Sequence, residues 1–156
     1  MMSIDQIQDE IVDEFAKLNG DIEKNLFHIV TLGQNLPVMP IEYKTDKNLI
    51  TGCHSKVWLA AVEKGDKVYF YGDSDTIISK GLVSLLLKVF NGQPPDQILM
   101  ANLYFLRRNG LERFIGTKRS NGFSAMIDQI KFSIAKNITI KKSFPDSKFH
   151  LDQKLF

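Results

Sequence analysis

The sequence predicts an α+β fold in which one antiparallel hairpin lies between helices. Two runs rich in β-branched and aromatic residues, 57–63 and 67–71, flank Lys64-Gly65-Asp66, which is a typical hairpin turn. The segments on both sides of the hairpin carry apolar residues at helical spacing. Since the chain has 156 residues and 44% of them are hydrophobic, it can bury one core, and we expect a single globular unit.

Two helices are expected before the hairpin. Ser3 and Gln6 form a capping-box signal, and apolar residues then recur at helical spacing. Asp21 opens a second helix, which ends where asparagine and two prolines occur within residues 35–40. The polar segment 41–50 has no clear period, so we expect a connection that brings the residues after it to the surface.

Helices are also expected directly after the hairpin. Apolar residues follow helical spacing over 75–89. The cap of this helix is expected among Asp73, Ser74 and Asp75. Gly81 interrupts it at a cost of about 1 kcal/mol relative to alanine, so close packing against a neighbouring element is the expected reason for the glycine. Two prolines then open a shorter helix over 94–99.

The last third of the chain is less regular. Residues 103–115 mix aromatic and aliphatic side chains with arginines, and Asn109-Gly110 is either a turn between extended pieces or a helix end. We predict one further strand in this segment. Ser120 opens another helix with clear apolar spacing. Periodicity fails beyond it, so residues 138–156 are expected to form a polar, lysine-rich tail.

Composition excludes several classes of partner. The net charge is only +2, whereas a nucleic-acid-binding protein carries a larger and clustered basic excess. The first 15 residues lack the pattern of a signal peptide, and no stretch approaches the roughly 18 apolar residues that span a bilayer. A lone cysteine without an export signal fits a reducing compartment. We therefore predict a cytoplasmic protein that binds neither nucleic acid nor membrane.

The lone cysteine is the main candidate for chemistry. A glycine precedes Cys53, and His54, Ser55 and Lys56 follow it, which favours a reactive thiol on a loop whose polar neighbours can stabilise a thiolate. A thiolate is both a nucleophile and a leaving group, so it can accept a sulfur atom as a persulfide and pass it on. With no second cysteine in the chain, no internal thiol can release that sulfur as sulfide.

Other kinds of site fit the sequence less well. A cysteine hydrolase needs a histidine base, but His28 lies in a helix, His150 in the tail, and the side chain of His54 points away from Cys53 if the segment is extended. A metal site needs several ligands at tight spacing, and a cluster scaffold needs about three cysteines, so we predict no metal. A binding module with an incidental thiol stays open, and it predicts that Cys53→Ser leaves activity unchanged.

The chain resembles the SufE family of sulfur acceptors. Three segments carry the resemblance: Gly52-Cys53-His54-Ser55-Lys56-Val57-Trp58, residues 73–82 and residues 119–126. Together with the first helix they cover residues 3–137 in the family's order, which is more specific than one short motif. The resemblance implies a small curved antiparallel sheet packed against helices, as in IscU-type scaffolds, within a domain of residues 1–137. Residues 138–156 lie outside it. At His54 the chain departs from the family, in which glutamine is common.

The resemblance also implies a function. Cys53 would take persulfide sulfur from a SufS-like cysteine desulfurase, stimulate that enzyme, and pass the sulfur to an iron-sulfur scaffold of the SufB or SufBCD kind. The protein would itself be no enzyme and would carry no cofactor, since pyridoxal phosphate belongs to the desulfurase. A CsdE-type acceptor that serves a different desulfurase and sulfur pathway is the alternative.

Four further residues are predicted to bind the partner or to support the cysteine loop: Arg119, Asp75, His54 and Gly52. Arg119 and Asp75 lie in the matching segments, and Gly52 and His54 flank the thiol. Transfer needs the two cysteines within bonding reach, so we expect the loop to swing, with Gly52 and the polar run 44–48 as its hinge.

Overall fold

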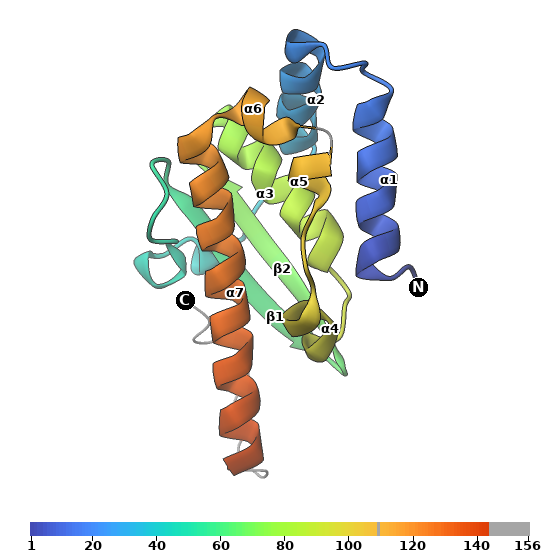
Figure 1. Ribbon diagram of the computed structural model, residues 1–156. Coiled ribbons are helices and arrows are strands. Elements are labelled where there is room, and N and C mark those ends of the chain that lie inside the picture. The colour runs from blue at the N-terminus through green and yellow to red at the C-terminus, as the bar shows by residue number, and fades with distance from the viewer. Residues whose placement is uncertain (109, 144–156) are drawn as a thin grey trace.

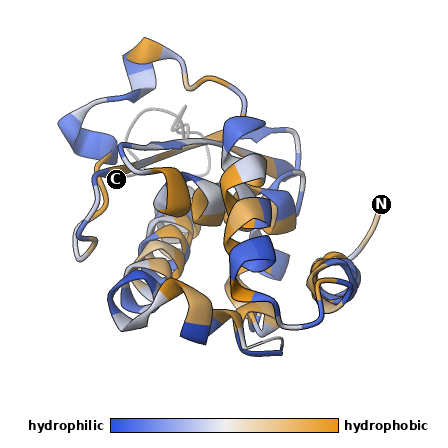
Figure 2. Cartoon of the chain, turned by 90° about the horizontal axis from the view of Figure 1, so that it is seen from above, coloured by the Kyte–Doolittle hydropathy of each residue, from blue (hydrophilic) through white to orange (hydrophobic). Residues whose placement is uncertain are grey.

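The computed structural model describes residues 1–108 and 110–143, and it confirms the α+β class (Figure 1). The elements of the described part follow one another as α1 (Ile4–Ala16), α2 (Ile22–Gln34), η1 (Ile41–Tyr43), η2 (Asp46–Asn48), β1 (Val57–Lys64), β2 (Lys67–Ser74), α3 (Ile77–Phe90), α4 (Pro95–Met100), α5 (Phe105–Arg108), α6 (Leu111–Ile115) and α7 (Thr117–Ser143), where η denotes a 3-10 helix. The view in Figure 2 shows that the helices carry both hydrophobic and hydrophilic residues, as expected of elements around one core. None of the helices in these ranges has the length and apolar character that a membrane span needs.

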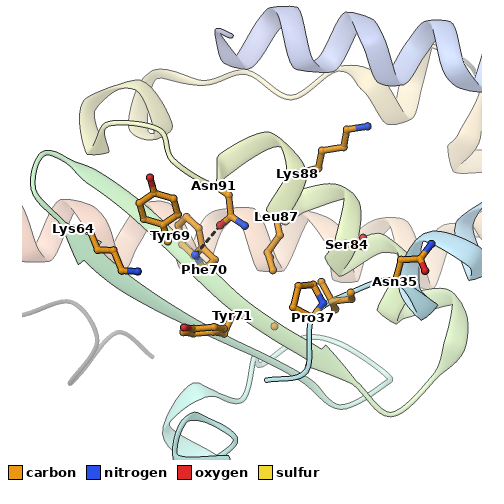
Figure 3. Close-up of a pocket in the computed structure, with 12 residues that line it drawn as sticks. Asn35, Pro37, Lys64, Tyr69, Phe70, Tyr71, Ser84, Leu87, Lys88 and Asn91 are labelled. Atoms are coloured by element: carbon orange, nitrogen blue, oxygen red, sulfur yellow. Dashed lines mark hydrogen bonds between the residues drawn. The ribbon is translucent and has the colours of Figure 1, made fainter. Parts of the chain in front are cut away.

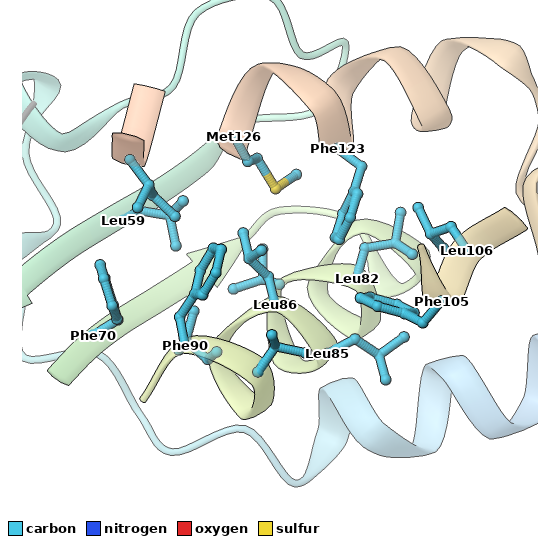
Figure 4. Packing of buried hydrophobic residues seen from close by; sticks show 14 of the residues in the cluster. Leu59, Phe70, Leu82, Leu85, Leu86, Phe90, Phe105, Leu106, Phe123 and Met126 are labelled. Atoms are coloured by element: carbon cyan, nitrogen blue, oxygen red, sulfur yellow. The ribbon is translucent and has the colours of Figure 1, made fainter. Parts of the chain in front are cut away.

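The predicted hairpin is confirmed. β1 and β2 pair antiparallel from Val57 opposite Ser74 to Lys64 opposite Lys67, which leaves a two-residue turn at Gly65-Asp66. Gly65 has φ +64°, the left-handed conformation that such turns require. Figure 4 shows Leu59 and Phe70 of this sheet facing side chains of α3 and α7, where the hydrophobic core lies.

The caps of the first two helices are confirmed. The Gln6 amide donates to the Ser3 hydroxyl at 3.1 Å and the Ser3 amide donates to the Gln6 side chain at 2.9 Å, so the capping box is complete. Asp21 accepts from the Lys24 amide at 3.0 Å. Apolar spacing did not indicate Gln8, which is fully buried on α1 and accepts from the Tyr104 amide at 2.7 Å. This contact ties the segment before α5 to α1.

The prediction of close packing at Gly81 is confirmed. A Cβ atom added at Gly81 would lie 2.2 Å from the carbonyl oxygen of Ile29, and one added at Gly33 would lie 2.7 Å from the Gly81 amide nitrogen. The backbones of α2 and α3 therefore touch where they cross, which no larger residue permits. This crossing fixes the position of α3, whose first turn borders the cysteine loop.

The strand predicted within residues 103–115 is wrong, because this segment forms α5 and α6. Gly110 between them has φ +64°, and Asn109 lies outside the described residues. Leu111 and Ile115 are buried whereas Arg113, midway between them, is exposed, which is a helical pattern because a strand would place all three on one face. Packing of these side chains on the core decides the conformation.

The last helix is longer than predicted at both ends. α7 begins at Thr117, three residues before Ser120, after Gly116 has closed α6 with φ +84°. It also continues past Asn137 to Ser143, so the predicted loss of helix is wrong up to that point. Asn137 is buried and Ile138 packs against the core, and each further residue adds a helical hydrogen bond once a helix exists. Residues 144–156 of the predicted tail lie outside the described ranges.

Candidate functional site

Cys53 lies between η2 and β1, where the chain packs directly on α7. Its thiol donates to the carbonyl oxygen of Gly122 at 3.5 Å. A Cβ atom at Gly122 would lie 3.4 Å from the Cys53 sulfur, and one at Gly52 would lie 3.4 Å from the Ala125 side chain. Gly52 also has φ +88°, a conformation that favours glycine. The loop therefore lies against α7 at ordinary contact distance, and Cys53 is half-buried there.

A small cavity adjoins the thiol. Its volume is about 20 Å³, and we call it the cysteine cavity. Its lining comes from the loop, β1, α3 and α7 and includes Cys53, Ser55, Val57, Ser79, Leu82 and Met126. A cavity of this size holds about one water-sized group. The thiol therefore has room beside it for one additional atom of that size.

Hydroxyl groups join the loop to the start of α3. The buried Ser79 hydroxyl donates to the Ser55 hydroxyl at 3.1 Å, and the hydroxyls of Ser55 and Thr76 are 2.7 Å apart. Ser55 and Ser79 both line the cysteine cavity, so two polar groups border the space beside the sulfur. The sequence pattern did not single out Ser79, because its place on one helix face became informative only with the loop packed against it.

Asp75 hydrogen-bonds to Lys56, the residue that follows Ser55. Its carboxylate accepts from the Lys56 amide at 2.9 Å, and its own amide donates to the Lys56 carbonyl at 3.1 Å. The prediction of a cap for α3 among residues 73–75 is wrong, since the cap position is Thr76 and no side chain caps the helix. The carboxylate of Asp75 bonds to the loop instead, and it does not line the cysteine cavity.

Arg119 and His54 are brought together with Cys53. Both residues are exposed and line the cysteine cavity, as does the neighbouring Lys118. Arg119 lies in the first turn of α7, where one guanidinium nitrogen donates to the Ile115 carbonyl at 3.0 Å. The rim of the cavity therefore carries two basic residues, Lys118 and Arg119, of which Arg119 was the predicted site residue.

The electrostatics of this conformation favour the thiol over the thiolate. Burial raises the pKa of Cys53 above its ordinary range. The expected stabilisation of a thiolate by the following residues is not what the contacts favour, since Ser55 bonds to hydroxyls of α3 and the Lys56 amide bonds to Asp75. The Gly122 carbonyl accepts from the thiol and so also supports its protonated form.

The segment predicted as a hinge is anchored. Lys44 donates to Asp73 at 2.9 Å, Tyr43 stacks on Tyr71 with ring centres 5.3 Å apart, and the Asn48 side chain donates to the Tyr43 carbonyl at 2.7 Å. Burial raises the pKa of the Asp73 carboxyl, but hydrogen bonds from Lys44 and the Ser74 amide and the charges of Lys44 and Lys80 outweigh it and hold that pKa below its usual range. Free movement of residues 44–48 would break these contacts.

The requirements of the alternative sites are not met within residues 1–108 and 110–143. No histidine there hydrogen-bonds to Cys53, as a hydrolase base would: His28 lies 3.5 Å from Glu14 and packs on Phe15. His150 lies outside the described residues. The same ranges hold no group of three or more His, Cys, Asp or Glu suited to a metal ion.

Comparisons with known proteins agree with the resemblance seen in the sequence. Residues 9–134 match the family model described as SufE, Fe-S metabolism associated domain. The chain is 36% identical over 128 residues to an uncharacterized SufE-like protein of Rhizobium meliloti, covering 79% of this chain and 91% of that one. A SufE-like protein of Rhizobium etli is 34% identical over 128 residues, covering 79% and 86%.

The fold resembles the solution structure of a hypothetical protein from Thermus thermophilus. The TM-score is 0.66 at 20% sequence identity, over 83% of this chain and 96% of that one. This likeness supports the α+β fold, and the family model, over residues 9–134, covers the cysteine loop and most of α7. The chain therefore belongs to the SufE family, whose domain is associated with Fe-S metabolism.

Proposed function

We propose that the protein accepts sulfur on Cys53 from a SufS-like cysteine desulfurase and passes it to an iron-sulfur scaffold of the SufB or SufBCD kind. One observation carries the proposal: the chain's lone cysteine lies on a loop and borders a cavity of about 20 Å³. That space suits the outer sulfur of a persulfide. Membership in a family associated with Fe-S metabolism supports the same role.

The transfer balances without a further reactant. The Cys53 thiolate attacks the outer sulfur of the persulfide on the desulfurase, a new S–S bond forms, and the S–S bond of the partner breaks. The partner's cysteine leaves as a thiolate and takes up the proton lost by Cys53, so no net oxidation occurs. The second transfer, to the scaffold, repeats this exchange with Cys53 as the leaving group. The acceptor needs no cofactor of its own for either step.

The contacts of Cys53 suggest two positions of the loop. Against α7 the thiol is protonated and holds one long hydrogen bond to Gly122, so this position stores the group and does not favour attack. Since residues 44–48 are anchored through Asp73 and Tyr71, the swing involves the residues close to Gly52, whose left-handed conformation allows a wide change of direction. Returned to α7, the outer sulfur would lie in the cysteine cavity and away from oxidants.

The residues around Cys53 have separate parts in this proposal. Arg119 and His54, exposed at the rim, contact the partner. Asp75 supports the loop through Lys56, and Gly52 provides its bend. Arg119→Glu should weaken stimulation of the desulfurase. Arg113→Glu is the matched control, because Arg113 is exposed on α6 and does not line the cavity.

Mass spectrometry tests the proposal directly. Incubation of the protein with a cysteine desulfurase and cysteine should add one sulfur to Cys53, about 32 mass units, and should speed alanine release. The Cys53→Ser variant should show neither effect. Equal stimulation by Cys53→Ser would overturn the proposal and favour a binding module. Comparison of a SufS-like desulfurase with the different desulfurase that a CsdE-type acceptor serves, each as donor, separates the SufE-type role from the CsdE-type alternative.

A further inference from the structure

A second cavity lies along β2 and shares no lining residue with the cysteine cavity (Figure 3). Its volume is about 360 Å³, within the range of sites that bind ligands or peptide side chains. We call it the edge groove and define it by Leu36, Pro37, Tyr71, Gly72, Ser84 and Leu87. One wall is β2, and the others are the segment after α2 and the C-terminal half of α3.

The outer edge of β2 is covered over only part of its length. The Val68 amide donates to the Gln93 carbonyl at 3.0 Å, and the Val68 carbonyl accepts from the Gly92 amide at 2.9 Å. Two residues on, the Phe70 amide donates to the Asn91 side chain at 2.7 Å, as the dashed line in Figure 3 shows. Residues 91–93, which follow α3, bond to β2 only as far as Phe70.

Gly72 is the next residue that presents its backbone to this edge. Strand residues direct their backbone groups to alternate sides, so the outward groups of Val68 and Phe70 are followed by those of Gly72. Among the described residues, none donates to the Gly72 carbonyl or accepts from its amide. Gly72 is nevertheless buried and lines the edge groove. Because buried backbone groups are nearly always paired, either water or a strand that enters the groove completes the pairing of this N–H and C=O.

The side chains around this free edge suit an extended peptide. Tyr69 and Tyr71 project from alternate positions of β2, and Pro37 and Leu87 line the opposite wall, so apolar surface lies beside the edge (Figure 3). A β-branched or aromatic side chain of an added strand would pack there, as in other complexes in which a peptide extends a sheet.

The charges of the edge groove select an acidic occupant. No aspartate or glutamate lines it, whereas Lys64 and Lys88 do. Lys88 lies 3.8 Å from Glu14, but the Lys64 ammonium lies 5.5 Å from the centre of the Tyr69 ring and pairs with no carboxylate of the described residues. Figure 3 shows Lys64 and Tyr69 at the end of the groove opposite Asn35 and Pro37.

We propose that the edge groove binds an extended peptide segment of a partner protein, which pairs with β2 at Gly72 and places an Asp or Glu side chain near Lys64. Backbone pairing supplies the affinity, and the aromatic walls and Lys64 supply the selection. The proposal does not depend on sulfur transfer at Cys53, and the two sites share no lining residue.

A phage-displayed library of random heptapeptides tests the proposal. Peptides are selected on the wild-type protein and depleted on Ser84→Trp, whose indole fills the groove, and Ser84→Ala is the matched control. We expect enriched peptides that contain an Asp or Glu and bind wild type and Ser84→Ala but not Ser84→Trp. Circular dichroism of Ser84→Trp checks that it is folded. A library that yields no peptide with this discrimination overturns the proposal.

Amide exchange of a selected peptide's complex tests the pairing itself. At saturation, exchange of the Gly72 amide should slow about tenfold or more, while the amides of Val68 and Phe70, which are already paired, should not change. Binding without protection of Gly72 overturns strand addition. Protection of Gly72 that grows with protein concentration alone, without peptide, assigns the groove to a second copy of the chain and also overturns it.

A charge reversal at Lys64 tests the preference of the edge groove for an acidic peptide. Lys64→Glu should weaken binding of the acidic peptide by roughly tenfold, since an attraction is replaced by a repulsion of similar size. Lys67→Glu carries the same change at the residue opposite Lys64 but outside the groove, and it should have a smaller effect. Equal effects of the two variants would show that only net charge matters and would overturn the placement beside Lys64.

Discussion

At the α2–α3 crossing and at the Cys53 loop a glycine faces a neighbouring element, but the two contacts differ in the space that remains around the glycine. At the crossing, a Cβ atom on Gly81 would lie 2.2 Å from the Ile29 carbonyl oxygen, so backbone meets backbone with no space to relax. At the loop, a Cβ atom on Gly122 would lie 3.4 Å from the Cys53 sulfur, which is an ordinary contact, and a cavity of about 20 Å³ remains beside it.

The difference separates a glycine that the fold requires from one that the site requires. Overlap with backbone cannot be relieved by a side-chain rotation, so the crossing tolerates no added atom. The loop holds Cys53 by one long hydrogen bond and leaves room for one more atom beside the sulfur. Stability should therefore respond to changes at the crossing, and chemistry to changes at the loop.

Gly81→Ala is expected to have the largest effect. The added methyl group must push α2 and α3 apart, and the better helix propensity of alanine, about 1 kcal/mol, offsets only part of that cost. We expect the free energy of unfolding to fall by about 2–3 kcal/mol, measured by urea denaturation. Ser84→Ala in the same helix is the control and should change little. A loss below about 1 kcal/mol for Gly81→Ala would mean that the crossing is not rigid.

The pH dependence of Cys53 alkylation probes the other region. Because burial raises the pKa of this thiol, the thiolate forms only above the ordinary range near pH 8.5, and the rate should rise about tenfold per pH unit up to that higher pKa. For the protein unfolded in urea, the alkylation rate should reach its plateau at a lower pH. Iodoacetamide labelling followed by mass spectrometry measures both profiles. A folded-state profile that levels off first would contradict the packed position of the thiol.

Local signals predicted the parts of the fold that are determined locally. The hairpin turn at Gly65, the capping box at Ser3 and the cap at Asp21 depend on residues within four positions of one another, and all are confirmed. The role of Gly81 was also predictable, because a glycine inside a helix needs a packing reason. The conformation of residues 103–115 was not, because Leu111 and Ile115 gain their burial from elements distant in sequence.

The candidate site was predictable to a similar degree. The placement of Cys53 on a loop followed from its neighbours in the sequence, and Arg119 from the resemblance of the α7 start. The roles of Ser79 and Asp75 depend on where the start of α3 meets the cysteine loop. The spacing of residues along the sequence does not reveal this contact. The contact of Gly122 was not predictable either. A glycine within a helix indicates close packing, but the residue that packs on it, Cys53, is 69 residues away in the sequence.

Gly122→Ala sharpens the contrast with Gly81→Ala. Its methyl group fits beside Cys53, and alanine is the better helix former, so the free energy of unfolding should stay unchanged or rise by up to about 1 kcal/mol. The methyl group also occupies part of the cysteine cavity, so under the proposed function a persulfide on Cys53 should be reduced by dithiothreitol about threefold faster. Mass spectrometry follows the added sulfur. Ser124→Ala, on the same helix but outside the cavity lining, is the control. Equal lifetimes would show that the cavity does not shelter the sulfur.

Asp75→Ala should have the smallest effect and should locate the mobile part of the loop. It removes the acceptor of the Lys56 amide, an interaction worth about 1 kcal/mol, so exchange of that amide should become about fivefold faster, and Asp75→Asn should restore part of the protection. Hydrogen exchange measures both variants. If the loop swings at Gly52, the alkylation rate of Cys53 should stay near that of the wild type, because Lys56 lies on the anchored side. An alkylation rate that rises together with exchange at Lys56 would move the hinge to the hydroxyl contacts of Ser55, and the loop would then open from α3 instead of bending at the glycine.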